Sequence, residues 1–462
     1  MPNGSIVTTQ DFHVDQRTGF VPPRMPLSRL SAEWETWEAT LDAARWQKFK
    51  AAEQLLMLDG PQKLVEEEKA LAWRNLVDKM PVLSVDNIKG CERQLRRAHL
   101  VLSFIVQFYA HTIPSTEPIS IPRSLTVPLL NVSRELNHAP YVTYSDHALH
   151  NWHHKHLHGQ DALPTIGNLR SQLTFTGTPE EDEFYMIDIR MELKGAEAVE
   201  LLRLSTDEIK AGNDTNADRI AMYLTQAGKI IKEMKDILMS LKDLVSPEVF
   251  YHDLRPWLVG ADADMWGRKW AWEGKEEVEG SKQMLTKISG PTAGQSPLVP
   301  ALDAYLGIEE DDSKSAFLDR VQSYMDHKHD EFLQILRSEK KFIRCFIQEI
   351  AEKQSTSSPI VVAYNAAVQE MKRFRDAHLI IVALYVIVPS KKNTRNSDKR
   401  IKISGIESGS VHGENGDDSL YEKAGGANDE QTGEAALGDD QGAQLVKFLK
   451  GFRDQTIHTF LE

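Results

Sequence analysis

Apolar residues recur along most of this chain at spacings of three and four positions, the period of an amphipathic α-helix. The run 216–245 is a clear example, because one side of it carries Ile220, Leu224, Ile231, Met234, Leu238, Leu241 and Val245. Residues 92–111 are apolar on most sides, which indicates a largely buried helix. Alternation with a period of two, typical of half-buried strands, is sparse. The pattern therefore predicts an all-α fold.

A second long helix is predicted between Ser358, a suitable N-cap followed by proline, and Pro389, which marks its end. Its apolar face carries His378, at helical spacing from Met371, Phe374, Ile381, Val382 and Tyr385. A histidine in such a place needs partners for its ring nitrogens. A backbone carbonyl or a carboxylate would serve. A metal would also serve, and a lone imidazole on an apolar helix suits haem iron.

Further helices are predicted at 143–153, 298–307 and 315–352 from the same periodicity. The Pro-rich stretch 115–142 predicts irregular backbone, and the Gly- and Trp-rich stretch 258–296 predicts loops.

The stretch 390–440 is different in kind, because it begins basic, becomes acidic and Gly-rich, and holds few large apolar residues. Such a composition cannot offset the entropy of ordering, which predicts a mobile loop. Helical spacing returns in 441–462, so we expect the loop to be anchored at both ends, as a lid would be.

Composition excludes several classes of protein. A net charge of −14 over 462 residues argues against nucleic-acid binding, which needs clustered Lys and Arg. The two cysteines, Cys91 and Cys345, give no disulfide framework. The N-terminus has no apolar signal core, and no apolar run is long enough to span a membrane. We therefore expect a cytoplasmic protein with no membrane partner.

The helix predicted after Pro247 carries one candidate binding pair. Tyr251 and Arg255 are four residues apart and lie on one helix face, with Phe250 on the neighbouring stripe. An aromatic ring beside a fixed guanidinium can hold a ligand that is flat at one end and anionic at the other. An amphipathic helix with a surface arginine would show the same spacing.

Three other features are less specific. The small residues of 289–296 would let a ligand approach the backbone, although an ordinary turn has the same composition. Asp303 sits on an otherwise apolar helix, where a carboxylate needs a partner. The histidine-rich run His150–His158 has no cysteine and no carboxylate at helical spacing, so the sequence leaves metal binding there open.

Several short motifs, in one order along nearly the whole chain, make it resemble the indoleamine 2,3-dioxygenase family of haem enzymes. They are FHVDQRTGFVPP, RRAHLVLSF, IPRSLTVPL, YSDHALHNW, FYMIDIRMELKGAEA, FYHDLRPWLVG, GPTAGQSPLVPALDAYLGI, RDAHLIIVALYVIVPS and LVKFLK. The resemblance implies a two-domain helical fold, with a small N-terminal domain over 1–165 and a large haem-binding domain over 166–462. It also implies that 390–440 is the substrate-closing loop.

The resemblance assigns roles to residues of this chain. His378 would be the proximal ligand of haem b, and Asp303 would support that side. Arg255 would pair with the substrate carboxylate. The distal and substrate pocket would be formed by Phe250, Tyr251, Tyr144, Phe184 and the small-residue loop of Gly290, Thr292 and Ala293.

Three positions depart from the family pattern. Asp188 stands where well-studied members have a serine, His147 where they have a cysteine, and Asp440 where their GTGG loop has its threonine. A carboxylate in a dry pocket is costly unless it is paired. We therefore expect Asp188 and His147 to face one pocket and to interact.

The resemblance implies opening of the indole ring of L-tryptophan by O₂ to give N-formylkynurenine, with an electron donor that reduces the haem. Two alternatives stay open: the same chemistry on another or modified indole, and a haem-binding protein with little catalysis. We expect a monomer.

Overall fold

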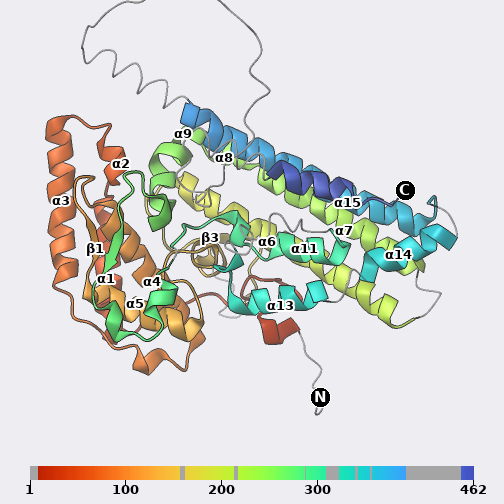
Figure 1. Ribbon diagram of the computed structural model, residues 1–462, viewed down its shortest axis with the longest axis horizontal. Coiled ribbons are helices and arrows are strands. Elements are labelled where there is room, and N and C mark those ends of the chain that lie inside the picture. Colours follow the sequence, from red (N-terminus) through yellow and green to blue (C-terminus); the bar gives the residue numbers. More distant parts are fainter. Residues whose placement is uncertain are drawn as a thin grey trace, which may run out of the picture.

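The computed structural model describes residues 9–156, 162–212, 217–286, 288–308, 322–338, 342–353, 356–391 and 449–461. Helices dominate this part of the chain, which confirms the predicted all-α class (Figure 1). The four strands found there have three residues each and form two small pairs. β1 (Ile119–Ile121) runs parallel to β4 (Trp270–Trp272), and β2 (Trp152–His154) runs antiparallel to β3 (Leu169–Ser171). Among the described helices, none has the length and apolar character needed to cross a bilayer.

The α-helices are α1 (Glu35–Gln47), α2 (Ala52–Leu55), α3 (Gly60–Asp78), α4 (Glu92–His111), α5 (Arg123–Leu136), α6 (Pro179–Lys210), α7 (Ala217–Met239), α8 (Leu241–Leu244), α9 (Pro247–Val249), α10 (Ser281–Met284), α11 (Leu298–Leu306), α13 (His327–Ser338), α14 (Phe342–Lys353) and α15 (Pro359–Val382). Residues 449–457 are also helical. Three segments are π-helical: η4 (Ser145–Leu149), η6 (Phe250–Leu254) and η12 (Ala383–Ile387). Short 3₁₀ turns are η1 (Thr9–Phe12), η2 (Ala32–Trp34), η3 (Asp86–Ile88), η7 (Arg255–Leu258), η8 (Ala261–Ala263), η9 (Lys275–Glu277) and η10 (Ala293–Gln295).

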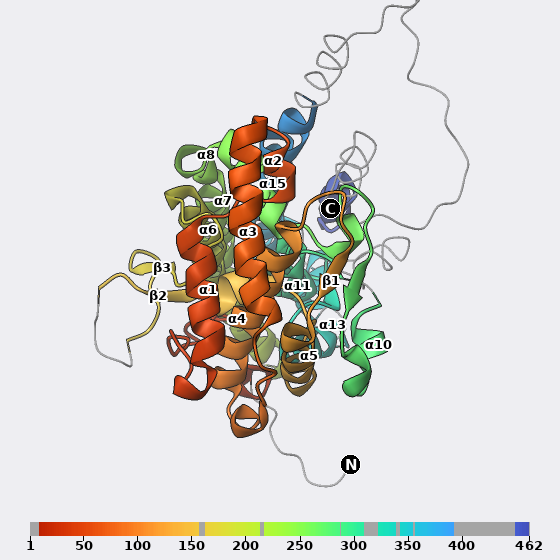
Figure 2. The ribbon, with the colours of Figure 1, turned by 90° about the vertical axis from the view of Figure 1, so that its left-hand side faces the viewer.

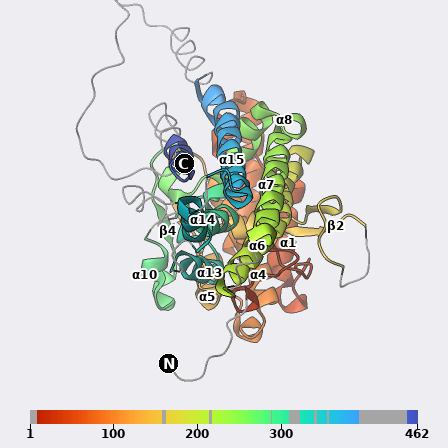
Figure 3. The same ribbon diagram turned by 90° about the vertical axis from the view of Figure 1, so that its right-hand side faces the viewer.

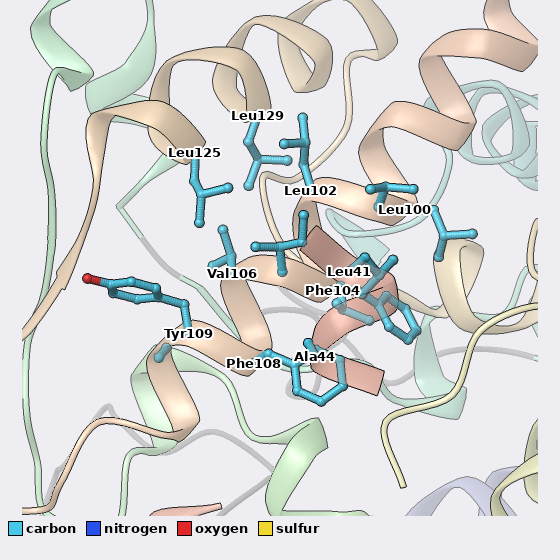
Figure 4. Packing of buried hydrophobic residues seen from close by; sticks show 14 of the residues in the cluster. Leu41, Ala44, Leu100, Leu102, Phe104, Val106, Phe108, Tyr109, Leu125 and Leu129 are labelled. Carbon is cyan, nitrogen blue, oxygen red and sulfur yellow. The ribbon is translucent and has the colours of Figure 1, made fainter. Parts of the chain in front are cut away.

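One apolar core forms around α4. Figure 4 shows side chains of α4 such as Phe104 and Phe108 packed near Leu41 of α1, with Leu125 and Leu129 of α5 close by. Helices α1 and α3 cover α4 in Figure 2. The same core also includes Leu254, Trp257, Leu258, Trp272 and Ile288. The boundary at residue 165 stays a prediction, because residues from both sides of it share this core.

A second core lies among long helices, where α7 packs against α6 on one side and α15 on the other (Figures 1 and 3). Gly228 permits the close approach of α7 and α15, because a Cβ atom there would lie 3.3 Å from the Cα of Ala367. Helix α6 begins at Thr178, whose side chain accepts a hydrogen bond from the backbone N–H of Glu181. Its first turns reach both cores through Phe184.

The predicted helices at 92–111 and 216–245 are confirmed as α4 and as α7 followed by α8. The helix predicted over 359–388 is α15, continued by η12. The irregular backbone predicted for 115–142 is wrong over α5, which holds Pro128 in its interior. Most of α5 is buried, so packing outweighs the local cost of the proline. Apart from residues 390 and 391, the loop predicted at 390–440 lies outside the described residues, as does Asp440.

Candidate functional site

A cavity of about 380 Å³ lies between α6, α11 and α15 and the segment 250–258. This volume is typical of a small-molecule site. Nearly all the predicted site residues line it: Tyr144, His147, Phe184, Asp188, Phe250, Arg255, Gly290, Thr292, Ala293, Asp303 and His378. The structure therefore gathers residues from distant parts of the sequence around one space. Tyr251 is the exception, because it does not line the cavity.

His378 is carried by α15, lines the cavity and is only partly buried. No hydrogen bond reaches either ring nitrogen from the described part of the chain, so the carbonyl or carboxylate partner left open by the sequence is not seen there. Burial, with a smaller effect of the nearby Arg375, lowers the pKa of His378 to about 4. The imidazole is therefore neutral at physiological pH, the form in which histidine binds a metal.

Arg375, one turn before His378 on α15, links three helices on the side of the cavity that carries His378. Its guanidinium donates hydrogen bonds to Asp303 Oδ2, at 2.5 Å, and to Thr456 Oγ1. The Arg375–Asp303 ion pair is mostly buried, which meets the need of Asp303 for a partner. Thr456 belongs to the helix at 449–457, so this arginine joins α11, α15 and the C-terminal helix. Sequence reasoning did not single out Arg375, although a charged residue at this place on a buried helix was a usable indication.

Arg255 reaches the cavity, and its guanidinium carbon lies 4.9 Å from the ring centre of Tyr251. The predicted pairing of these residues is confirmed, and the guanidinium packs against the ring of Tyr251. Phe250 lies 5.0 Å from Phe184 and 5.7 Å from Tyr385, measured between ring centres, and forms an aromatic wall. The site thus has a flat apolar surface beside a fixed cation.

All three of these π-helical segments place cavity residues. Tyr144 is the N-cap of η4 and His147 lies in its middle, Phe250 begins η6, and Tyr385 lies in η12. π-Helical turns are rare and frequent at functional sites, because the extra residue re-aims the side chains of the turn. The 3.6-residue period used to read the sequence does not predict them.

The loop before α11 is held close to the backbone of 258–260. A Cβ atom at Gly290 would lie 2.1 Å from the carbonyl oxygen of Leu258, so only glycine fits. The Gln295 side chain donates to the Gly290 carbonyl, at 3.1 Å, and accepts from the Tyr144 N–H, at 2.8 Å. The loop and Tyr144 therefore form one edge of the cavity.

Asp188 and His147 interact, as predicted. His147 Nε2 lies 3.4 Å from Asp188 Oδ2, and both side chains are mostly buried. His147 Nδ1 lies 3.1 Å from the carbonyl oxygen of Thr143. The pair joins η4 to α6 at the cavity wall.

Glu192, one turn after Asp188 on α6, is a buried carboxyl that sequence reasoning missed. Its Oε1 accepts hydrogen bonds from Tyr144 Oη, at 2.9 Å, and from Ser296 Oγ, at 2.6 Å. Burial raises the pKa of Glu192 to about 7, with a smaller contribution from Asp188. Its partners are distant in sequence, so only the structure shows the network.

We expect Glu192 to make the stability of the protein depend on pH. Because its pKa is higher in the folded chain than its usual 4.5, the folded state binds the proton more tightly, and the free energy of unfolding falls as pH rises from about 4.5 to about 7. Glu192→Gln should abolish this fall and gain up to about 3 kcal/mol relative to the parent above pH ~7. Urea unfolding across this pH range measures it, with the exposed Glu197→Gln on the same helix as the control. An equal pH dependence in parent and Glu192→Gln would contradict the assignment.

Two groups of possible metal ligands occur among the described residues, His99 with His138 and Asp146, and His13 with Glu92 and Asp326. Neither includes His378 or the run that begins at His150, whose last residue, His158, lies outside the described part. His99 is already bonded through both ring nitrogens, to Asp146 and to the Ala139 carbonyl. That pair braces the chain next to Tyr144.

Comparison with known proteins agrees with this arrangement. The family model of indoleamine 2,3-dioxygenase matches residues 8–459. The chain is 28% identical to an indoleamine 2,3-dioxygenase of Saccharomyces cerevisiae, over 97% of this chain and 93% of the relative. It is 28% identical to indoleamine 2,3-dioxygenase 2 of Homo sapiens, over 84% and 86%, and 29% identical to a 6-hydroxytryptophan 2,3-dioxygenase of Fusarium equiseti, over 87% and 91%. The chain therefore belongs to the indoleamine 2,3-dioxygenase family, haem-dependent oxidoreductases that act on indoles with O₂.

Proposed function

We propose that this protein opens the C2–C3 bond of the indole ring of L-tryptophan with O₂ and gives N-formylkynurenine, using haem b held by His378. The observation that carries the proposal is that a neutral imidazole and the guanidinium of Arg255 face the same cavity. The first is suited to an iron ion and the second to a carboxylate. An electron donor is needed to reduce the iron.

The residues present fit a haem group. His378 offers a ring nitrogen that no described residue occupies, and the walls beside it are apolar, with Phe374, Ile381 and Val382 from α15. The small side chains of the loop at 290–293 leave room over a flat ligand. When bound, haem iron supplies the redox chemistry by which O₂ reacts with an indole.

The protein itself contributes orientation and a dry pocket. Arg255, fixed against Tyr251, holds the carboxylate of the amino acid by a charge-assisted hydrogen bond. Phe184 and Phe250 pack on the indole ring and exclude water. Holding the reacting carbons in one place removes much of the entropic cost of the reaction. No protein nucleophile takes part.

The second candidate function keeps the chemistry and changes the indole. It is favoured by the polar Asp188–His147 pair in the cavity wall. A relative that aligns with 87% of this chain carries the name 6-hydroxytryptophan 2,3-dioxygenase, which supports this candidate.

The experiment that tests the proposal supplies the reduced, haem-loaded protein with L-tryptophan and with ring-hydroxylated tryptophans in air. We expect loss of the indole absorbance and formation of the formylkynurenine product from tryptophan. A haem spectrum with no consumption of any indole would instead indicate a haem-binding protein without this activity. Consumption of modified indoles alone would favour the second candidate.

A further inference from the structure

We infer that the Asp188–His147 pair is a recognition site for a hydroxyl group on the benzene ring of the substrate indole. This inference rests on the proposed function and adds a substrate class to it. The two residues line the cavity, contact each other and come from separate elements, α6 and η4.

The hydrogen bonds of His147 fix the charge of the pair. The carbonyl oxygen of Thr143 can only accept, so the nitrogen facing it, Nδ1, carries a hydrogen. The other nitrogen, Nε2, faces a carboxyl oxygen of Asp188. A stable contact there needs one proton, held either by the imidazole or by the carboxyl group. In both cases the charges of the pair sum to zero.

Asp188 keeps one oxygen available to a ligand. Only Oδ2 contacts His147, and no hydrogen bond reaches Oδ1 from the described part of the chain. The side chain is 12% exposed, and it lines the cavity. A carboxyl oxygen with a spare lone pair at a cavity wall accepts a hydrogen bond from a hydroxyl donor.

Helix α6 carries Asp188 one turn beyond Phe184 along the wall of the cavity. Phe184, Asp188 and Glu192 follow one another at intervals of four residues on one helix face, about 6 Å apart along the axis. Phe184 packs against Phe250, five residues before Arg255. Arg255, Phe184 and Asp188 line one cavity, so a substrate with its carboxylate on Arg255 and its ring against Phe184 would lie beside Asp188.

Glu192 makes this end of the cavity suited to a neutral group. Burial raises its pKa to about 7, so its carboxyl group is mostly protonated below neutral pH. It adds no second negative charge beside Asp188. With the pair also neutral overall, the site has little attraction for an ammonium group and selects a hydroxyl.

The test compares hydroxytryptophans with the matched methoxytryptophans, which keep the oxygen but lose the hydrogen-bond donor. The haem-loaded parent is given L-tryptophan and each isomer, and both kcat/KM and the dissociation constant from calorimetry are measured. At one ring position or more, we expect the hydroxy compound to exceed the methoxy compound by about 10-fold, as for one well-formed hydrogen bond. Asp188→Ser with His147→Cys should reduce that ratio to within about threefold.

Controls separate this inference from the proposed function. Glu197→Gln, an exposed carboxylate of α6, should leave the ratio as in the parent. If the double variant fails to hold haem, Asp188→Ala, which removes the acceptor oxygens, must reduce the ratio instead. Equal values for hydroxy and methoxy compounds in the parent, or a ratio that the variants retain, would overturn the inference while tryptophan turnover stands. A binding preference without turnover would instead count against the proposed function alone.

Discussion

His378→Ala is expected to yield a purified protein without bound haem. The imidazole is neutral and faces the cavity, and no described residue competes for its ring nitrogens. The other histidine of the cavity, His147, is already bonded to Thr143 and Asp188, so it cannot take over as ligand without losing those contacts. The Soret absorbance per protein should fall to background.

His156→Ala provides the matched control, because His156 is exposed and remote from the cavity lining. It should keep the haem content of the parent. Imidazole added to His378→Ala should restore part of the absorbance, since the space left by the side chain can hold it. Full haem occupancy in His378→Ala without added imidazole would show that another residue is the ligand.

Arg255→Ala is expected to keep haem and to lose about 10- to 100-fold in kcat/KM for tryptophan. The reason is the loss of a charge-assisted hydrogen bond, worth about 1.5–3 kcal/mol, to the substrate carboxylate. Arg255→Lys should fall between parent and Arg255→Ala, because lysine keeps the charge but not the two-pronged geometry or the stacking on Tyr251.

Tryptamine serves as the control substrate, because it has the indole ring but no carboxylate. If Arg255 acts on the carboxylate, Arg255→Ala should change kcat/KM for tryptamine far less than for tryptophan. Equal losses for both substrates would mean that the arginine acts on the pocket as a whole.

The long helices could be predicted because the residues that favour them lie within each helix and at its ends. Helix α15 has a suitable residue and proline at its start and an apolar face of the right period, and its first residue was predicted correctly. Helix α5 could not be predicted in this way, because Pro128 is locally unfavourable and the burial that compensates for it is a property of the whole fold.

The same difference between local and long-range information applies to the candidate site. Motifs indicated His378, Arg255 and Asp303, and the structure brings all three to one cavity. The hydrogen bonds and ion pairs that position such residues could not be predicted, because they join positions far apart in sequence. Arg375 is 72 residues from Asp303, and Ser296 is 104 residues from Glu192. Tyr251 was assigned to the pocket, whereas its ring lies against the Arg255 guanidinium and does not line the cavity.

The central claim is that this chain inserts both atoms of one O₂ molecule into the indole ring of tryptophan. The most direct measurement is the product mass after the reduced, haem-loaded protein meets L-tryptophan under ¹⁸O₂. We expect a formylkynurenine in which both added oxygen atoms carry the label. A product with a single labelled oxygen, or with oxygen drawn from water, would contradict it.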